Sequence, residues 1–241
     1  MRRQAALKMG LALAVLFAIA SIGFSRNALP KVYAPVIDPA DFVAVIGNPL
    51  FPLTPGTTFI YEGEEDGLPT RDEMTVTHDT KVIRGVTCTV VRDRAFLEGV
   101  LVEDTFDWYA QDKLGNVWYF GEDTRQLDPD GNVISTEGSW EAGVNGALPG
   151  IIMEARPRVG DKYRQEFALG VAEDQAQVIS LHRRATVPFG SFDDLLLTKE
   201  FSPLEKGVVE HKYYAPGVGF ILGVVGKGGD ERTELVEIIT E

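Results

Sequence analysis

Tryptophan side chains recur through the middle of the chain, where they could hold an apolar or amphipathic molecule. Trp108, Trp118 and Trp140 lie on successive segments that have the composition of strands. Successive strands of an antiparallel meander are usually neighbours in space, so these rings should lie close together. In a wide barrel the inward-facing rings would line an apolar cavity, whereas in a narrow barrel they would fill the core. The tryptophans therefore predict either a small-molecule site or a packed interior.

The residues around Leu97-Glu98-Gly99 predict a β-hairpin that carries a pair of opposite charges. Apolar and polar side chains alternate on both sides of these residues, and a three-residue turn that ends in glycine forms a bulged hairpin. This turn places Cys88 opposite Trp108. It also places Arg92 opposite Asp104 on the same face, which we expect to line the interior. An inward Arg92–Asp104 pair is either a structural ion pair or a polar anchor for a ligand.

The longest stretch without a strand pattern is 141–160, which holds four glycines and two prolines. Its apolar residues include Ile152 and Met153. A loop of this length inside a compact domain is often functional. We expect it either to form a flap over the barrel mouth, where it would touch a ligand, or to plug the barrel end.

The segment Asp128-Pro129-Asp130-Gly131-Asn132 could bind calcium, because it offers alternating oxygen ligands and a glycine for a sharp turn. Asp128, Asp130 and Asn132 would be the ligands. The segment has no downstream glutamate of the EF-hand type, and the same residues also suit a plain hairpin turn. A calcium site and a simple turn are therefore both open readings.

Known catalytic motifs are missing from the sequence. There is no Gly-x-Ser-x-Gly elbow and no phosphate-binding glycine loop, and the three histidines lack metal-ligand spacing. Paired acids such as Glu137 with Glu141, or Glu173 with Asp174, could support glycoside hydrolysis. Acidic residues are common in this chain, however, so we favour a non-enzymatic protein and keep a carboxylate-dependent hydrolase as an alternative.

Short runs rich in Val, Ile, Thr and aromatic residues are separated by turn residues from Thr57 onward, which predicts an all-β fold. No segment shows a helical period. We expect an antiparallel meander of about eleven or twelve strands that forms a barrel or a strongly curved sheet. The expected strands are 57–63, 72–79, 82–96, 100–111, 116–123, 132–140, 161–168, 174–187, 193–202, 206–215, 218–225 and 231–240.

The N-terminus has the pattern of an export signal. Arg2, Arg3 and Lys8 precede an uncharged run, and Ala18-Ile19-Ala20 suits cleavage after residue 20. Residues 1–20 are therefore expected to be a signal peptide, or an anchor if they are retained. The proline-rich segment 21–50 predicts an extended tether, and 51–241 predicts a single β domain.

The formal net charge of the 241-residue chain is −13. Such a chain repels phosphate backbones, so we expect no nucleic-acid partner. Contact with a membrane is expected only through the N-terminal segment if that segment is not cleaved. Cys88 is the one cysteine, so no intrachain disulfide can form.

Four segments resemble a group of uncharacterised bacterial secreted proteins and lipoproteins. These segments are Asn48–Thr57 (NPLFPLTPGT), Asp107–Asp112 (DWYAQD), Gly115–Glu122 (GNVWYFGE) and Tyr213–Gly219 (YYAPGVG). The resemblance implies export and a β-rich fold, and it implies no activity.

Together these observations predict a periplasmic or secreted binding module. Its partner would be a small apolar or amphipathic molecule, or a protein of the cell envelope. A calcium-stabilised envelope or adhesion domain and a carboxylate-dependent hydrolase are the alternatives.

Overall fold

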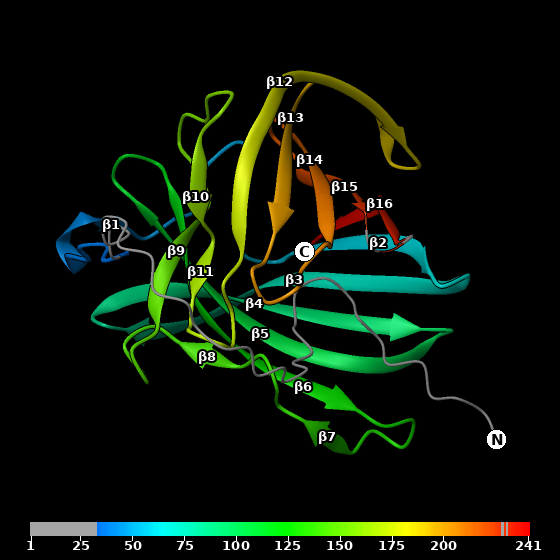
Figure 1. Cartoon of the computed structure of the whole chain (residues 1–241), viewed down its shortest axis with the longest axis horizontal. Coiled ribbons are helices and arrows are strands. Elements are labelled where there is room, and N and C mark those ends of the chain that lie inside the picture. The colour runs from blue at the N-terminus through cyan, green and yellow to red at the C-terminus, as the bar shows by residue number, and fades with distance from the viewer. Residues whose placement is uncertain (1–32, 228, 230) are drawn as a thin grey trace, which may run out of the picture.

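The computed structural model describes residues 33–227, 229 and 231–241 (Figure 1). The expected signal peptide, 1–20, lies outside these residues. Within them the chain is all-β apart from one short 3₁₀ helix, η1 (Pro39–Asp41). The strands are β1 (Phe42–Val43), β2 (Thr57–Glu65), β3 (Leu68–Ile83), β4 (Val86–Leu97), β5 (Val100–Asp112), β6 (Val117–Leu127), β7 (Val133–Ser135), β8 (Trp140–Glu141), β9 (Leu148–Met153), β10 (Lys162–Arg164), β11 (Glu166–Phe167), β12 (Gln175–Val187), β13 (Gly190–Phe201), β14 (Val209–Ala215), β15 (Gly219–Lys227) and β16 (Arg232–Thr240).

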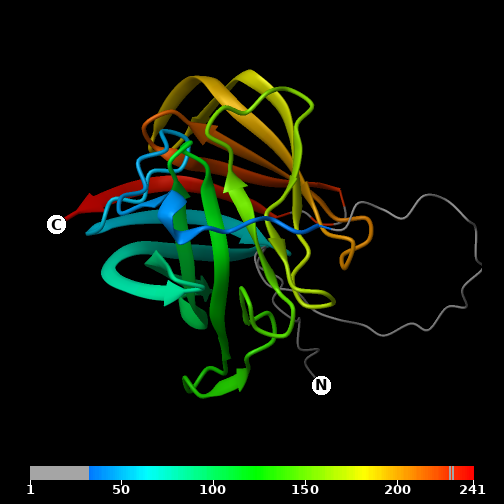
Figure 2. The same ribbon diagram turned by 90° about the vertical axis from the view of Figure 1, so that its left-hand side faces the viewer.

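The strands form one antiparallel meander that nearly closes into a barrel, which confirms the predicted fold class. Each strand from β12 to β16 pairs with the next, and the same holds from β2 to β6. β16 pairs with β2 and so joins the C-terminal strands to the N-terminal ones. Figure 1 shows β12–β14 crossing β2–β5 steeply, and Figure 2 shows the later strands arching over the earlier ones. The described residues contain no helix long and apolar enough to cross a membrane.

The two edges of the meander meet at residues 162–167. β10 extends the sheet beside β12, and β11 pairs with β9, which in turn pairs with β6. Only Gln165 separates β10 from β11 in the sequence. Here the backbone passes so close to β9 that a Cβ atom at Gly150 would lie 2.3 Å from the carbonyl carbon of Gln165.

The structure corrects two of the expected segments. Residues 141–160 are not irregular throughout, because they contain strand β9, whose proline and glycine hide its strand pattern. The expected strand 132–140 is instead two short strands, β7 and β8, each pairing with β6.

The predicted hairpin register was wrong by two residues. Leu97 pairs with Val100 across a two-residue turn, in which Glu98 and Gly99 have φ values of 50° and 80°. Two successive left-handed residues are the signature of a type I′ hairpin turn. A bulge after Ala95 then shifts the pairing, so Arg92 lies opposite Phe106 rather than Asp104. Since the shift is an even number of residues, each side chain stays on the face that it shares with its expected partner.

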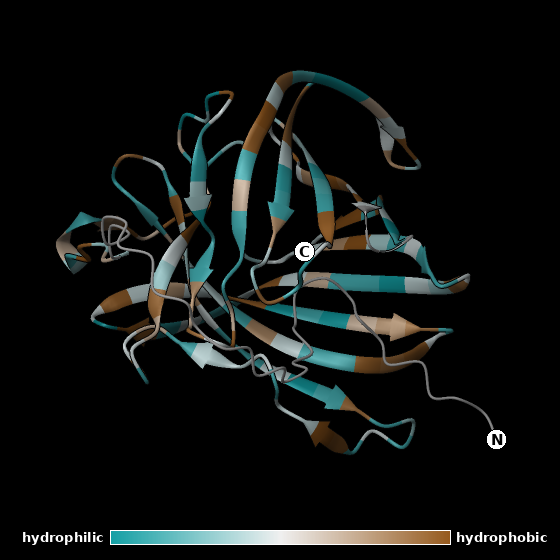
Figure 3. Cartoon of the chain, viewed as in Figure 1, coloured by the Kyte–Doolittle hydropathy of each residue, from teal (hydrophilic) through white to brown (hydrophobic). Residues whose placement is uncertain are grey.

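The N-terminal segment covers the outer face of β5 and β6. β1 pairs with β5, and the Phe42 ring packs edge-on against Trp118 and Phe120, with centroid distances of 6.4 and 5.6 Å. Ile46, only 3% exposed, forms an isolated antiparallel β-bridge with Leu53. Residues 33–50 are therefore packed onto the barrel rather than forming a free tether, and the folded domain begins before residue 51. In Figure 3 apolar and polar positions alternate along the strands, as expected for a sheet whose two faces differ.

Replacing Gly150 with alanine tests the barrel closure. The added methyl group cannot fit against the Gln165 backbone, so we expect a loss of about 1–3 kcal/mol in the free energy of unfolding, seen as a Tm lower by several degrees. The matched control is Gly47→Ala, because nothing lies within 4 Å of a Cβ at that position. Equal Tm values for the two variants would contradict the close approach.

Candidate ligand-binding cavity

A cavity of about 150 Å³ lies inside the barrel, between β2–β5 and β14–β16. This is the liquid volume of roughly five water molecules. Part of its wall is apolar and aromatic, contributed by Phe51, Tyr61, Met74, Tyr109, Ile152 and Phe220. The cavity is thus a shaped space with a partly apolar wall. A space of this volume holds a group about the size of benzene, and a larger ligand would extend beyond it.

Four carboxylates from neighbouring strands face this cavity: Asp72 on β3, Asp93 on β4, and Glu103 and Asp107 on β5. Cross-strand pairing explains why they share a face. Ala95 on β4 pairs with Asp72 on one side and with Glu103 on the other. Asp93, two residues before Ala95, pairs with Met74. Because directly opposed residues of paired strands point to the same side, these acids form one continuous surface.

The four acids have few hydrogen-bonding partners. The Tyr119 hydroxyl donates to Asp107 Oδ1 at 2.5 Å, and Thr105 Oγ1 lies 3.1 Å from Glu103 Oε1. Asp93 Oδ1 is shielded from solvent and has no hydrogen-bond partner. In the part of the chain that the structure describes, no Lys, Arg or His side chain forms an ion pair with any of the four.

Burial raises the pKa of each of these carboxyl groups, because the charged form loses its hydration. The pKa rises to about 6 for Asp93, to about 7 for Glu103 and to about 8 for Asp107. For Asp72 the pKa lies well above its usual value, through burial and then through repulsion by Asp93 and Glu103. Near neutral pH the cavity therefore holds a mixture of protonated and ionised acids.

Lys212 on β14 is the one basic residue in the cavity wall, and it is already paired. Its Nζ lies 3.0 Å from Glu200 Oε2 and 3.3 Å from Glu210 Oε2. Burial lowers the pKa of Lys212, but attraction to Glu200 and Glu210 outweighs that effect and raises it overall. Its charge is thus paired with acids on β13 and β14.

The structure separates the residues that the sequence suggested for ligand binding. Ile152 lines the cavity, and Met153 beside it is fully buried in the core. Trp140 is buried behind the cavity wall, where its Nε1 donates to Glu166 Oε2 at 3.2 Å and its ring packs edge-on against Tyr119. The tryptophan therefore supports the wall and does not form it.

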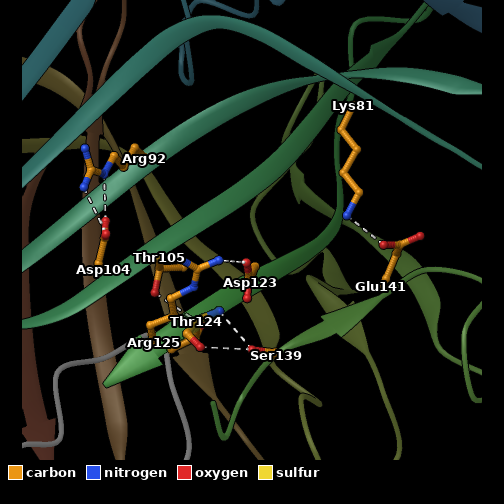
Figure 4. A network of polar contacts seen from close by, with 9 residues as sticks. All are labelled: Lys81, Arg92, Asp104, Thr105, Asp123, Thr124, Arg125, Ser139 and Glu141. Carbon is orange, nitrogen blue, oxygen red and sulfur yellow. Dashed lines mark hydrogen bonds and ion pairs between the residues drawn. The ribbon is translucent and has the colours of Figure 1, made fainter. Parts of the chain in front are cut away.

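Arg92, Asp104, Trp108 and Trp118 lie on the opposite face of the sheet, which corrects the expectation that this face lines the interior. Arg92 and Asp104 do pair, diagonally across the strands, with Nε to Oδ1 at 2.7 Å (Figure 4). Lys81 Nζ lies 3.3 Å from the Trp108 ring centroid. Trp118 Nε1 donates to Asp112 Oδ2 at 2.9 Å. On this outer face Trp108 is buried and Arg92 remains partly exposed.

The suggested calcium loop forms a closed turn. Asp128 Oδ1 accepts hydrogen bonds from the backbone amides of Asp130 and Asn132, and the Asn132 side chain donates to both Asp128 oxygens. These bonds hold the pKa of Asp128 below its usual value. Within residues 33–227, 229 and 231–241, no three acidic, histidine or cysteine side chains come together to hold a metal ion.

The acid pairs suggested for hydrolysis do not form a site together. Glu137 is exposed, and Glu141 pairs with Lys81 at 2.8 Å (Figure 4). Glu173 Oε1 accepts from the Gly170 amide at 2.9 Å, as part of a turn.

Sequence reasoning missed the four cavity acids because it assigned their face to solvent. Glu103 and Asp107 alternate with apolar residues, a pattern typical of a strand with one solvent-exposed face. One available signal was that Glu103 and Asp107, four residues apart on one strand, share a face.

No protein-family model and no curated protein matches the sequence. Two solved structures are similar in fold. One, from Bacteroides fragilis, is assigned as an exported protein with a YmcC-like fold; it has a TM-score of 0.46 and 13% identity, and the match covers 79% of this chain and 99% of that one. The other, from Parabacteroides distasonis, is assigned as a lipoprotein; it has a TM-score of 0.44 and 14% identity, and the match covers 79% and 98% of the two chains. At these identities the similarity concerns the fold alone.

The buried acids predict that stability falls as pH rises. The folded protein keeps protons that the unfolded chain releases above about pH 4, so the free energy of unfolding should decrease between about pH 4 and pH 8. Asp107→Asn keeps the acceptor for Tyr119 but removes one such proton site. We expect it to flatten the slope by on the order of 1 kcal/mol per pH unit.

Urea unfolding at a series of pH values measures this slope. Asp79→Asn is the matched control, because Asp79 is exposed on β3 and the substitution makes the same change in charge. If Asp107→Asn gave a curve parallel to that of the unmodified protein, the Asp107 carboxyl would not be the titrating group.

Proposed function

We propose that this chain is an exported β-barrel protein that binds a small amphipathic molecule in its interior cavity. The observation that carries the proposal is the 150 Å³ cavity, whose wall combines aromatic and apolar side chains with several carboxyl groups. A protein that needed the barrel only as a scaffold would gain stability by filling this space with apolar side chains. Export to the periplasm or beyond rests on the N-terminal pattern at residues 1–20.

A carboxylate-dependent hydrolase is the second candidate, because the pKa of Asp93 is about 6 and that of Asp107 about 8. At neutral pH one acid would be mainly ionised and the other mainly protonated, as acid–base pairs in enzymes are. An assay with nitrophenyl glycosides separates the two functions. Turnover that disappears in both Asp93→Asn and Asp107→Asn would favour the enzyme, and no turnover would favour the binding protein.

Native mass spectrometry of the mature protein, purified gently from its own host, tests binding directly. We expect an excess mass of a few hundred daltons that is lost on unfolding. A bare polypeptide mass would count against a retained ligand and would favour a role through a protein partner.

Filling the cavity should abolish binding. Ala95, 7% exposed, lines the cavity from β4. We expect Ala95→Phe to weaken binding of the neutral fluorescent probe N-phenyl-1-naphthylamine at least tenfold, because the added ring occupies the space that the probe needs. The control is Val82→Phe, on the outer surface of β3, where the side chain is 65% exposed. Thermal melting confirms that both variants fold, and equal probe affinity in both would place the probe elsewhere.

A further inference from the structure

We propose that the cavity selects an organic cation, an ammonium group attached to an apolar body, and that Asp93 is the residue that receives the charge. This inference rests on the proposed binding function and specifies its ligand. It follows from the balance of charge in the cavity wall, from one buried oxygen without a partner, and from the aromatic side chains nearby.

The cavity wall has a large excess of acid. Eight of its lining residues are Asp or Glu, and Lys212 is the one base. Lys212 is bound to Glu200 and Glu210, so it cannot neutralise the acids of β3–β5 across the cavity. An anionic ligand would be repelled from such a wall, whereas a cation would be attracted in proportion to the number of ionised acids.

Asp93 marks the point where the charge would bind. Asp93 lines the cavity from β4, and its Oδ1 atom is shielded from solvent and accepts no hydrogen bond. A buried carboxylate oxygen left without a donor is unfavourable, and a ligand N–H group would remove that penalty. Asp72 and Glu103 lie on the flanking strands β3 and β5, and repulsion by Asp93 contributes to the raised pKa of both.

Aromatic rings complete the site. Tyr61, Tyr109 and Phe220 line the cavity, and the negative faces of such rings attract ammonium groups. The apolar part of the ligand has a matching surface at Met74 and Ile152. A bare metal ion fits less well, because among the described residues no three suitable side chains converge on one point.

The site should respond to pH through the groups that face Asp93. The titratable groups of the cavity wall around it are Tyr61, Glu64 and Glu65 on β2, Asp72 on β3, Glu103, Asp107 and Tyr109 on β5, and Glu210, Lys212, Tyr214 and Glu231 across the cavity. A bound ammonium group favours the ionised form of Asp93, whose pKa of about 6 lies within the accessible range. Affinity for a cation should therefore increase from pH 5.5 to pH 7.5, and affinity for a neutral molecule should not.

A matched pair of fluorescent probes tests the inference on the folded mature protein. Dansylcadaverine carries an ammonium group at the end of an apolar chain, and N-butyl dansylamide has the same fluorophore without the charge. We expect the cationic probe to bind at least tenfold more tightly at pH 7.5. Asp93→Asn should remove most of this difference while leaving the neutral probe unchanged, and Asp79→Asn should leave both affinities unchanged.

The outcomes separate the inference from the function on which it rests. Equal affinity for the two dansyl probes, or a preference that survives Asp93→Asn, would overturn the cation site while the binding function stands. Failure of both dansyl probes together with binding of N-phenyl-1-naphthylamine would also overturn it. If none of the three probes bound, the proposed function itself would fail.

Discussion

The interior of this barrel depends on the short junction at residues 162–167, where the two edges of the sheet meet. β10 continues the β12 edge, and β11 pairs with β9 on the other side, with Gln165 between them. The backbones approach so closely that position 150 has no room for a side chain. Without this junction β9 would be an open edge of the sheet. Four carboxyl groups that face the cavity lie on β3–β5, and burial inside the curved sheet raises their pKa values.

Enclosing carboxylates in this way is unfavourable, and the structure offsets only part of the penalty. Tyr119 donates to Asp107, and Thr105 lies beside Glu103, but Asp93 Oδ1 receives nothing. Protonation supplies the remaining relief, which is why the pKa values rise toward and beyond neutral pH. Ionisable groups held in an unfavourable environment beside a cavity are typical of binding and catalytic sites. The apolar wall at Met74 and Ile152 gives the same cavity a place for uncharged parts of a ligand.

The central strands have two covered faces, and this explains where inference from sequence failed. In β5, Trp108 is buried on one face and Tyr109 on the other, so neither face is fully exposed to solvent. The outer face is covered by the N-terminal segment through Phe42, and the inner face surrounds the cavity. Alternation along a strand identifies two faces but does not say which of them is enclosed. Arg92 and Asp104 were accordingly assigned to the interior, although the pair itself exists.

The sequence by itself determined the local structure: the all-β class, the positions of the long strands and the presence, though not the length, of the turn that contains Glu98 and Gly99. These follow from residue type and period-two alternation, which act over a few neighbours. Only the tertiary structure decided the rest. The bulge after Ala95 set the register, and β9 emerged from a segment rich in glycine and proline. The pairing of β16 with β2 placed β14–β16 across the cavity from an apparently solvated row of acids. Burial depends on which distant strands meet, and no local pattern in β3, β4 or β5 contains that information.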